Sequence, residues 1–82
     1  MRLPRSVNFP FGFNIRIRQL TRTEMNETIG YDAVAGWTHA ERTIYLTKSR
    51  TTKQKRSDLA HELGHAAVDY VDYLLNSGLG KL

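Results

Sequence analysis

The sequence predicts an α+β domain in which a small antiparallel sheet of about three strands packs against one long C-terminal helix. Apolar and polar residues alternate from Phe13 to Leu20, which is the period of a half-buried strand. The segment from Thr43 to Thr47 is rich in β-branched and aromatic residues, which favour strands. Beyond Thr51, apolar residues recur at the spacing of one helix face. The strands are therefore expected first and the helix last.

The first expected strand, residues 13–20, directs Ile15 and Ile17 towards a core and the arginines between them towards solvent. Residues 1–10 contain two prolines and are expected to form an irregular lead-in. The aromatic residues expected in the core are Phe9, Phe11, Phe13 and Trp37.

The other two expected strands form an antiparallel hairpin. Residues 26–30 are expected to be a connection, and Tyr31 to Trp37 is the second strand candidate, although Gly36 weakens it. Residues 39–42 are expected to form the turn into the third strand, residues 43–47. A basic loop, residues 48–51, follows.

The C-terminal helix has a clear start and stop. Thr51 can cap its N-terminus, with Gln54 at the capping-box position, and Ser77 with Gly78 supplies the stop. At 100° per residue, one face is apolar and is expected to cover the sheet. Its residues are Leu59, Leu63, Ala66, Ala67, Tyr70 and Leu74. The opposite face is expected to border a cleft and collects Asp58, His61, Glu62, His65, Asp69, Asp72 and Asn76.

Composition limits the class of protein. Eighty-two residues make one domain, 1–82, and the absence of cysteine excludes disulfides and thiolate metal ligands. The N-terminal segment does not resemble a signal peptide, and no apolar run reaches membrane-spanning length, so a cytoplasmic location without membrane contact is expected. The net charge of +4 is better explained by a solvated surface than by nucleic-acid binding, because no recognition motif accompanies it.

The residues His61-Glu62-Leu63-Gly64-His65 form an H-E-x-x-H motif. Histidines at i and i+4 lie about 40° apart on one helix face, so both imidazoles can bind one Zn²⁺. Glu62 beside them can accept a proton from the attacking water as general base. The motif therefore predicts a zinc-dependent hydrolase, with a peptide bond as the expected substrate.

The third metal ligand is open. Catalytic zinc has three protein ligands and one open position. Asp69 is the slight favourite because it lies nearer along the helix, and Asp72 is the alternative because its angle around the helix is better. A residue from a second subunit is a further alternative, since a short chain gains stability from dimerising. His39 is expected at a hairpin tip instead.

Other polar residues of the helix have weaker assignments. Asp58 lies one turn before His61 and is a candidate to orient an imidazole. The tyrosines Tyr31, Tyr70 and Tyr73 are candidate donors to an oxyanion, although packing explains Tyr70 and Tyr73 better.

The order of strand, hairpin, basic loop and H-E-L-G-H helix is similar to that of small zincins, and it resembles the ImmA/IrrE-type metallopeptidases in particular. The resemblance rests on Thr43 to Leu46 and on Arg56 to His65. It implies a twisted sheet with the motif helix across it, zinc on His61 and His65, and Glu62 as general base. It also implies that an extended peptide binds along the edge strand nearest the cleft, and that the substrates are regulatory proteins.

Two alternatives remain for the function. One is a catalytically inactive zincin-like module that binds or regulates a partner, of a kind encoded by viruses or mobile elements. The other, less favoured, is a basic nucleic-acid-binding protein. Its candidate residues are Arg16, Arg18, Lys48, Arg50, Lys53, Lys55 and Arg56.

Overall fold

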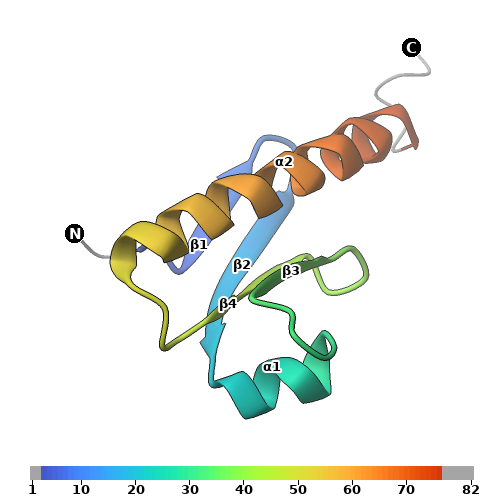
Figure 1. Cartoon of the computed structure of the whole chain (residues 1–82). Coiled ribbons are helices and arrows are strands. Elements are labelled where there is room, and N and C mark those ends of the chain that lie inside the picture. Colours follow the sequence, from blue (N-terminus) through green and yellow to red (C-terminus); the bar gives the residue numbers. More distant parts are fainter. Residues whose placement is uncertain (1–2, 77–82) are drawn as a thin grey trace.

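The computed structural model describes residues 3–76, which form two helices and four strands in a mixed order along the chain (Figure 1). Their bounds are β1 Ser6–Phe9, β2 Phe13–Leu20, α1 Arg22–Thr28, β3 Ala35–Thr38, β4 Thr43–Thr47 and α2 Thr52–Asn76. The α+β class and the long C-terminal helix are confirmed. The expected helix stop at Ser77 and Gly78 lies outside the described residues.

The strands of residues 3–76 form one four-stranded sheet in the order β1-β2-β4-β3. The hairpin of β3 and β4 is antiparallel as expected, with Trp37 opposite Ile44. The sheet differs from the expectation in having a fourth strand and one parallel pair, because β2 and β4 run in the same direction. A parallel pair needs a crossover, and here α1 and β3 occupy the connection from β2 to β4.

Two elements fall where the sequence showed no periodic pattern. β1 lies in the expected lead-in and pairs with β2, closed by a turn in which Phe11 and Gly12 have positive φ. Helix α1 begins at a capping box between Thr21 and Glu24, and only its Met25 is buried. A single buried residue in a seven-residue helix leaves no apolar stripe, which explains why residues 26–30 were expected to be a connection.

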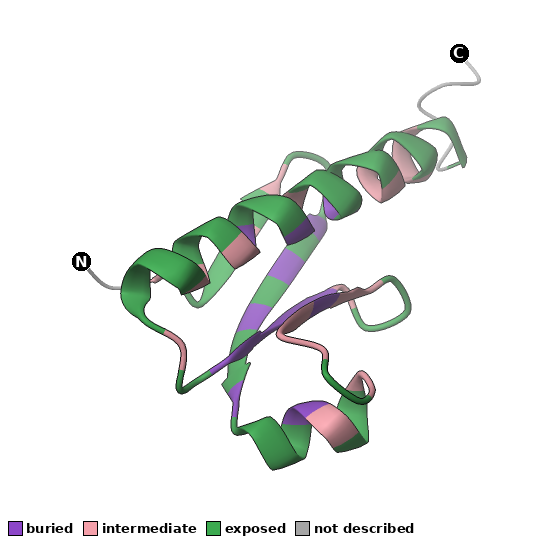
Figure 2. Cartoon of the chain, in the orientation of Figure 1, coloured by how far each residue is buried: buried purple, intermediate pink, exposed green. Residues whose placement is uncertain are grey.

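The sheet has a helix on each face. On one face α2 covers the main core, formed by Phe13, Ile15, Ile17, Ile44, Leu46, Leu59 and Ala66. On the other face α1 covers a smaller cluster of Leu20, Met25 and Tyr45 at one end of the sheet. The central strand β4 is therefore buried along its whole length (Figure 2).

Helix α2 begins as expected, with Thr51 and Gln54 in reciprocal hydrogen bonds of 3.0 and 3.1 Å. Its sheet-facing side is rotated from the expected apolar face. Leu59 and Ala66 are buried as expected, but Glu62 is buried beside them and Ala67 is exposed. The aromatic prediction also needs one correction, because Phe11 is 65% exposed at the β1–β2 turn, where it cannot reach the core.

Within residues 3–76, no helix combines the length and the apolar composition that crossing a membrane requires.

Replacing Gly36 with Ala should destabilise the fold. A Cβ built on Gly36 would lie 2.9 Å from Cγ2 of Ile29, so the Ile29 side chain or the β3 strand must shift. Overpacking of this kind costs about 1–3 kcal/mol, measured as the free energy of unfolding in urea. The double variant with Ile29→Ala removes the clash, so Gly36→Ala should then cost far less. An equal cost in both backgrounds would show that the contact is not the cause.

Candidate metal centre

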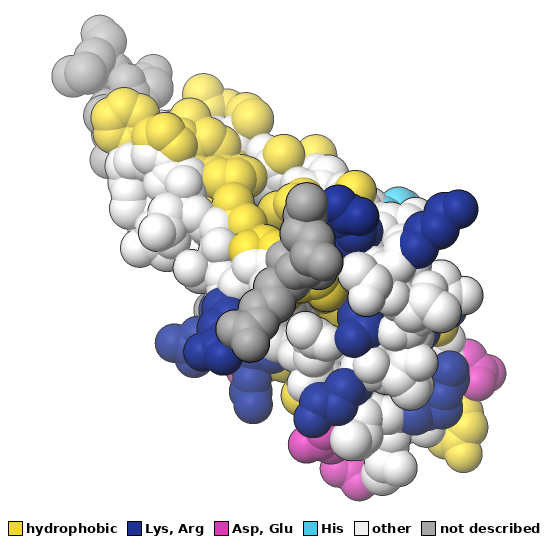
Figure 3. All heavy atoms as spheres, turned by 90° about the vertical axis from the view of Figure 1, so that its left-hand side faces the viewer, with side chains coloured by type: hydrophobic (Ala, Val, Ile, Leu, Met, Phe, Trp, Pro, Cys, Tyr) yellow, Lys and Arg dark blue, Asp and Glu magenta, His cyan; other side chains and the backbone are white. Residues whose placement is uncertain are grey.

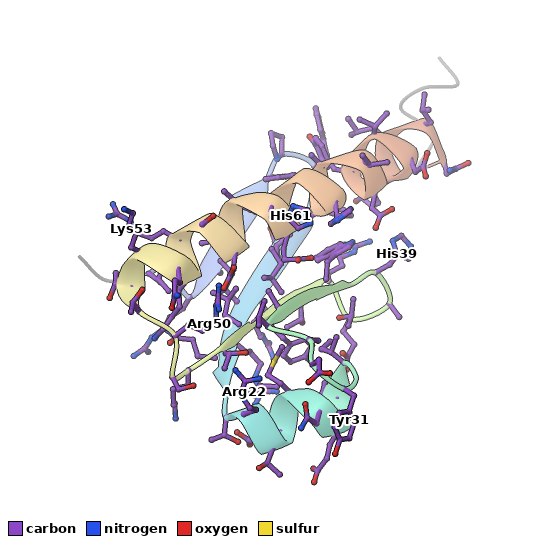
Figure 4. All side chains as sticks on the ribbon, viewed as in Figure 1. Arg22, Tyr31, His39, Arg50, Lys53 and His61 are labelled. Atoms are coloured by element: carbon purple, nitrogen blue, oxygen red, sulfur yellow. The ribbon has the colours of Figure 1, made fainter. Side chains whose placement is uncertain are left out.

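The two histidines of the motif lie on the exposed side of α2, one turn apart. Their rings meet edge to face with centroids 4.9 Å apart, and the two Nε2 atoms are separated by 3.3 Å. Figure 4 shows His61 on the middle of α2. The helix alone brings both ring nitrogens to one point, as the i, i+4 spacing predicts.

The separation of the nitrogens fits a shared zinc ion. Two imidazole nitrogens that each bind Zn²⁺ at about 2.0–2.1 Å in tetrahedral geometry lie roughly 3.3 Å apart. The distance of 3.3 Å between His61 and His65 matches that edge. Because both rings are exposed, an ion could reach them without a change in the fold.

Glu62 lies on a different side of α2 from the histidines. It is only 8% exposed and shares the sheet-facing side with Leu59 and Ala66. The Glu62 side chain therefore faces the sheet, whereas both imidazoles face solvent.

Asp69, the favoured third ligand, is engaged elsewhere. Its Oδ2 accepts a hydrogen bond of 2.5 Å from Nε1 of Trp37 and lies 3.2 Å from Nδ1 of His39. The hydrogen bond from Trp37, followed by the contact with His39, lowers the pKa of the Asp69 carboxyl. This cluster of Trp37, His39 and Asp69 ties the β3–β4 turn to α2, and Figure 4 shows His39 reaching from that turn towards the helix.

Asp72, the alternative ligand, is exposed on α2. Within residues 3–76, no group of three or more His, Asp and Glu side chains is close enough to hold a metal ion. The chain thus brings His61 and His65 together and leaves Asp69 and Asp72 apart from them. The assignment of Asp69 or Asp72 as the third metal ligand stays a prediction.

The remaining polar candidates have other partners. Asp58 accepts two hydrogen bonds from Arg50, at 2.7 and 3.3 Å, and so anchors the loop before α2. The hydroxyl of Tyr73 donates to the carbonyl of Phe11 at 2.6 Å, while Tyr70 packs edge-on against Phe9. Tyr31 is 86% exposed, and Figure 4 shows it beside α1, away from α2.

A hollow of ≈ 410 Å³ opens beside the C-terminal half of α2, and it contains none of the three motif residues. Its lining is Phe13, His39, Arg42, Asp72, Tyr73 and Asn76. The guanidinium of Arg42 lies 4.7 Å from the ring centre of Phe13 and 4.8 Å from that of Tyr73. Sequence reasoning missed this stack and the Trp37–Asp69 bond, because both join residues about 30 or more positions apart.

Strand β3 lies at the edge of the sheet, packs against α2 and pairs with no strand of residues 3–76 on its outer side. The amide of Thr47 donates to the carbonyl of Val34, so these two residues form a hydrogen-bonded pair of the hairpin. In an antiparallel pair of strands, hydrogen-bonded and non-hydrogen-bonded pairs alternate, so Ala35 opposite Leu46 and Trp37 opposite Ile44 are non-hydrogen-bonded pairs. Ala35 and Trp37 fall on the positions that direct N–H and C=O away from β4. β3 is therefore open to an added strand on its outer side.

Comparison with known proteins identifies the family. A family model described as "IrrE N-terminal-like domain" (Peptidase_M78) matches residues 13–78. The match spans β2 to the end of α2 and includes the whole motif, so the chain belongs to this peptidase family. Searches of the curated proteins and of the solved structures gave no match.

Zinc should stabilise the protein through the two histidines. A ligand that binds only the folded chain adds about 2.7 kcal/mol to the free energy of unfolding at 100 times its Kd. We expect this gain in thermal unfolding with added zinc, and its loss in the His61→Ala/His65→Ala variant. His39→Ala is the matched control and should keep the gain. Equal stabilisation of all three proteins would contradict the site.

The carboxylate of Asp69 should make stability depend on pH. Its folded-state pKa is lowered, so its contribution is present above the unfolded pKa and is lost as pH falls through the folded pKa. Asp69→Asn should lower the free energy of unfolding by about 1–2 kcal/mol at pH 7. The difference in this free energy between the variant and the parent should shrink below about pH 4. Asp72→Asn, measured without zinc, is the control. A difference that is constant from pH 7 to pH 3 would refute the assignment.

Proposed function

We propose that this member of the IrrE N-terminal-like family is a zinc-dependent peptidase in which His61 and His65 hold the metal and Glu62 is the general base. The observation that carries the proposal is the 3.3 Å separation of the two Nε2 atoms, with a buried glutamate on the adjoining side of the same helix. Family membership supports the peptidase class.

In the proposed mechanism, zinc and Glu62 have separate roles. When bound, zinc supplies a Lewis acid and lowers the pKa of a coordinated water towards neutrality. Glu62 accepts the proton of the attacking water and later delivers it to the leaving amine. Because Glu62 is held against the sheet, it is oriented without any contribution from the substrate.

The substrate we propose is an extended segment of a peptide or protein. Such a segment would pair with the outer side of β3, where Ala35 and Trp37 direct their backbone groups. This edge lies beside α2, which packs on β3 and β4. A peptide bound there passes the sheet side of the helix, on which Glu62 lies. We propose that the protein acts in the cytoplasm.

A non-catalytic binding module is the second candidate, and one observation favours it. Within the described residues 3–76 no third ligand joins the histidines. The nucleic-acid alternative gains no support, because Arg50 already pairs with Asp58 and Lys55 donates to Gln19.

Glu62→Gln should separate the two candidates. A peptidase should lose about 10²–10⁴ in kcat/KM when its general base is removed, while zinc binding is kept. The measurement uses zinc-loaded protein and a mixed-sequence library of internally quenched peptides. Glu27→Gln, on exposed α1 surface, is the control and should keep full activity. No cleavage by the parent protein, or cleavage by Glu62→Gln at the rate of the parent, would contradict the peptidase proposal.

A further inference from the structure

The guanidinium of Arg42 lies on the wall of the hollow beside the C-terminal half of α2. Its central carbon is 4.7 Å from the ring centre of Phe13 and 4.8 Å from that of Tyr73. Its Nη1 donates to the carbonyl of Gly12 at 3.3 Å. The two rings contact each other, with their centroids 5.2 Å apart. Contacts with both rings and with the backbone therefore limit the orientation of this side chain.

The groups that hold Arg42 are themselves fixed by the fold. Phe13 is 1% exposed and belongs to the main core. The hydroxyl of Tyr73 donates to a backbone carbonyl of the β1–β2 turn at 2.6 Å. The backbone of Arg42 is held as well, because its amide donates to the carbonyl of His39 and its carbonyl accepts from the amide of Arg16. The guanidinium is thus positioned before a ligand arrives, which lowers the entropic cost of binding.

The surroundings of Arg42 suit an anionic ligand. A guanidinium carries several N–H donors, and the bond to Gly12 uses one of them. A carboxylate can accept two parallel hydrogen bonds from the others. The carbonyl of Gly12 and the rings of Phe13 and Tyr73 hold the cation without neutralising its charge. A carboxylate that enters the hollow therefore gains both hydrogen bonds and charge attraction.

The neighbouring carboxylates leave the hollow predominantly positive beside Arg42. Glu41 accepts hydrogen bonds from Tyr45 at 2.9 Å and from Thr38 at 3.3 Å. Asp72 lines the same hollow, but among the ion pairs of residues 3–76 none joins it to Arg42. Asp72 is exposed, whereas Arg42 is half-buried. Water screens the charge of the exposed Asp72 more strongly, so the cation dominates near the two rings.

We propose that this hollow is a substrate subsite in which Arg42 binds a carboxylate of the peptide, from an acidic side chain or from a C-terminus. The inference rests on the proposed function, because it concerns the peptide that the proposed peptidase binds. The hollow contains none of the three motif residues. Arg42 is therefore a residue that determines specificity, and it takes no part in the bond cleavage.

A peptide on the outer side of β3 would lead to this hollow. β3 ends at Thr38, and the next residue, His39, lines the hollow. Nδ1 of His39 lies 3.2 Å from Oδ2 of Asp69, which fixes this end of β3 beside α2 (Figure 4). Each strand residue advances about 3.3 Å, so a peptide paired beside Trp37 reaches the level of His39 in about two residues. A carboxylate at or beyond that level can enter the hollow.

Other cationic side chains lack this fixed arrangement. Figure 3 shows Lys and Arg side chains spread over the side of the molecule that carries the basic loop before α2. Arg22 has the same charge as Arg42, but it is exposed on α1, which covers the other face of the sheet (Figure 4). Arg22→Gln is therefore a matched control, since it removes the same charge far from the hollow.

Equilibrium binding of peptides to the zinc-loaded Glu62→Gln variant tests the proposal without cleavage. The probes are fluorescent peptides of alternating alanine and threonine, capped at both ends, with one glutamate moved along the chain. A matched set carries glutamine in place of glutamate, and a third set of several lengths has a free C-terminal carboxyl group. At one position, glutamate should bind about tenfold more tightly than glutamine, as one charged hydrogen bond gives. A gain confined to the third set would assign the hollow to a C-terminus.

Substitutions in the same background test whether Arg42 causes the preference for a carboxylate. Arg42→Gln should lose the preference, and Arg42→Lys should keep only part of it, because an ammonium cannot form the two parallel bonds. Asp72→Asn should strengthen it, because a like charge leaves the hollow. Arg22→Gln should leave it unchanged. The affinity ratio of the two peptides within one protein is independent of the folded fraction, because partial unfolding weakens both affinities equally.

Repeating the measurements without zinc separates this inference from the proposed function. A preference for a carboxylate that requires Arg42, in a protein that neither binds zinc nor cleaves peptides, would uphold the subsite while the proposed function fails. Cleavage of peptides without such a preference, or a preference that Arg42→Gln retains, would overturn the inference and leave the proposed function standing. Neither binding nor cleavage of any peptide would overturn both.

Discussion

The rotation of α2 about its own axis is the constraint on which the rest of the molecule depends. Burial of Leu59 and Ala66 against the sheet sets this rotation, and the bond from Trp37 to Asp69 holds it one turn beyond the motif. At 100° per residue, a helix fixed in this way leaves no freedom to its other side chains. Glu62 must face the sheet and both histidines must face outwards.

In this orientation, each side of α2 presents a different set of residues. Its sheet side closes the core and includes the buried side chain of Glu62. Its flank presents two imidazole nitrogens at the spacing of a tetrahedral metal site. Its outer side carries the exposed apolar residues Val68, Val71 and Leu75. One helix thus supplies both the core packing and the histidine pair.

The sequence was sufficient wherever one periodic pattern decided the structure. The cap at Thr51, the β3–β4 hairpin and the i, i+4 histidines follow from local rules. The prediction failed where a single contact decided the structure, as with Met25, the one buried residue of α1. The third ligand could not be derived, because the hydrogen bond that occupies Asp69 comes from Trp37, 32 positions away. Helical angle alone also placed Glu62 with the histidines, whereas side-chain packing put it on the sheet side.

The central claim is that zinc binds the imidazoles of His61 and His65. X-ray absorption at the zinc edge of the loaded protein measures the ligands directly. We expect two imidazole nitrogens at about 2.0–2.1 Å from the zinc, with oxygen ligands completing a four-coordinate shell. A shell of oxygen atoms alone, without imidazole scattering, would contradict it.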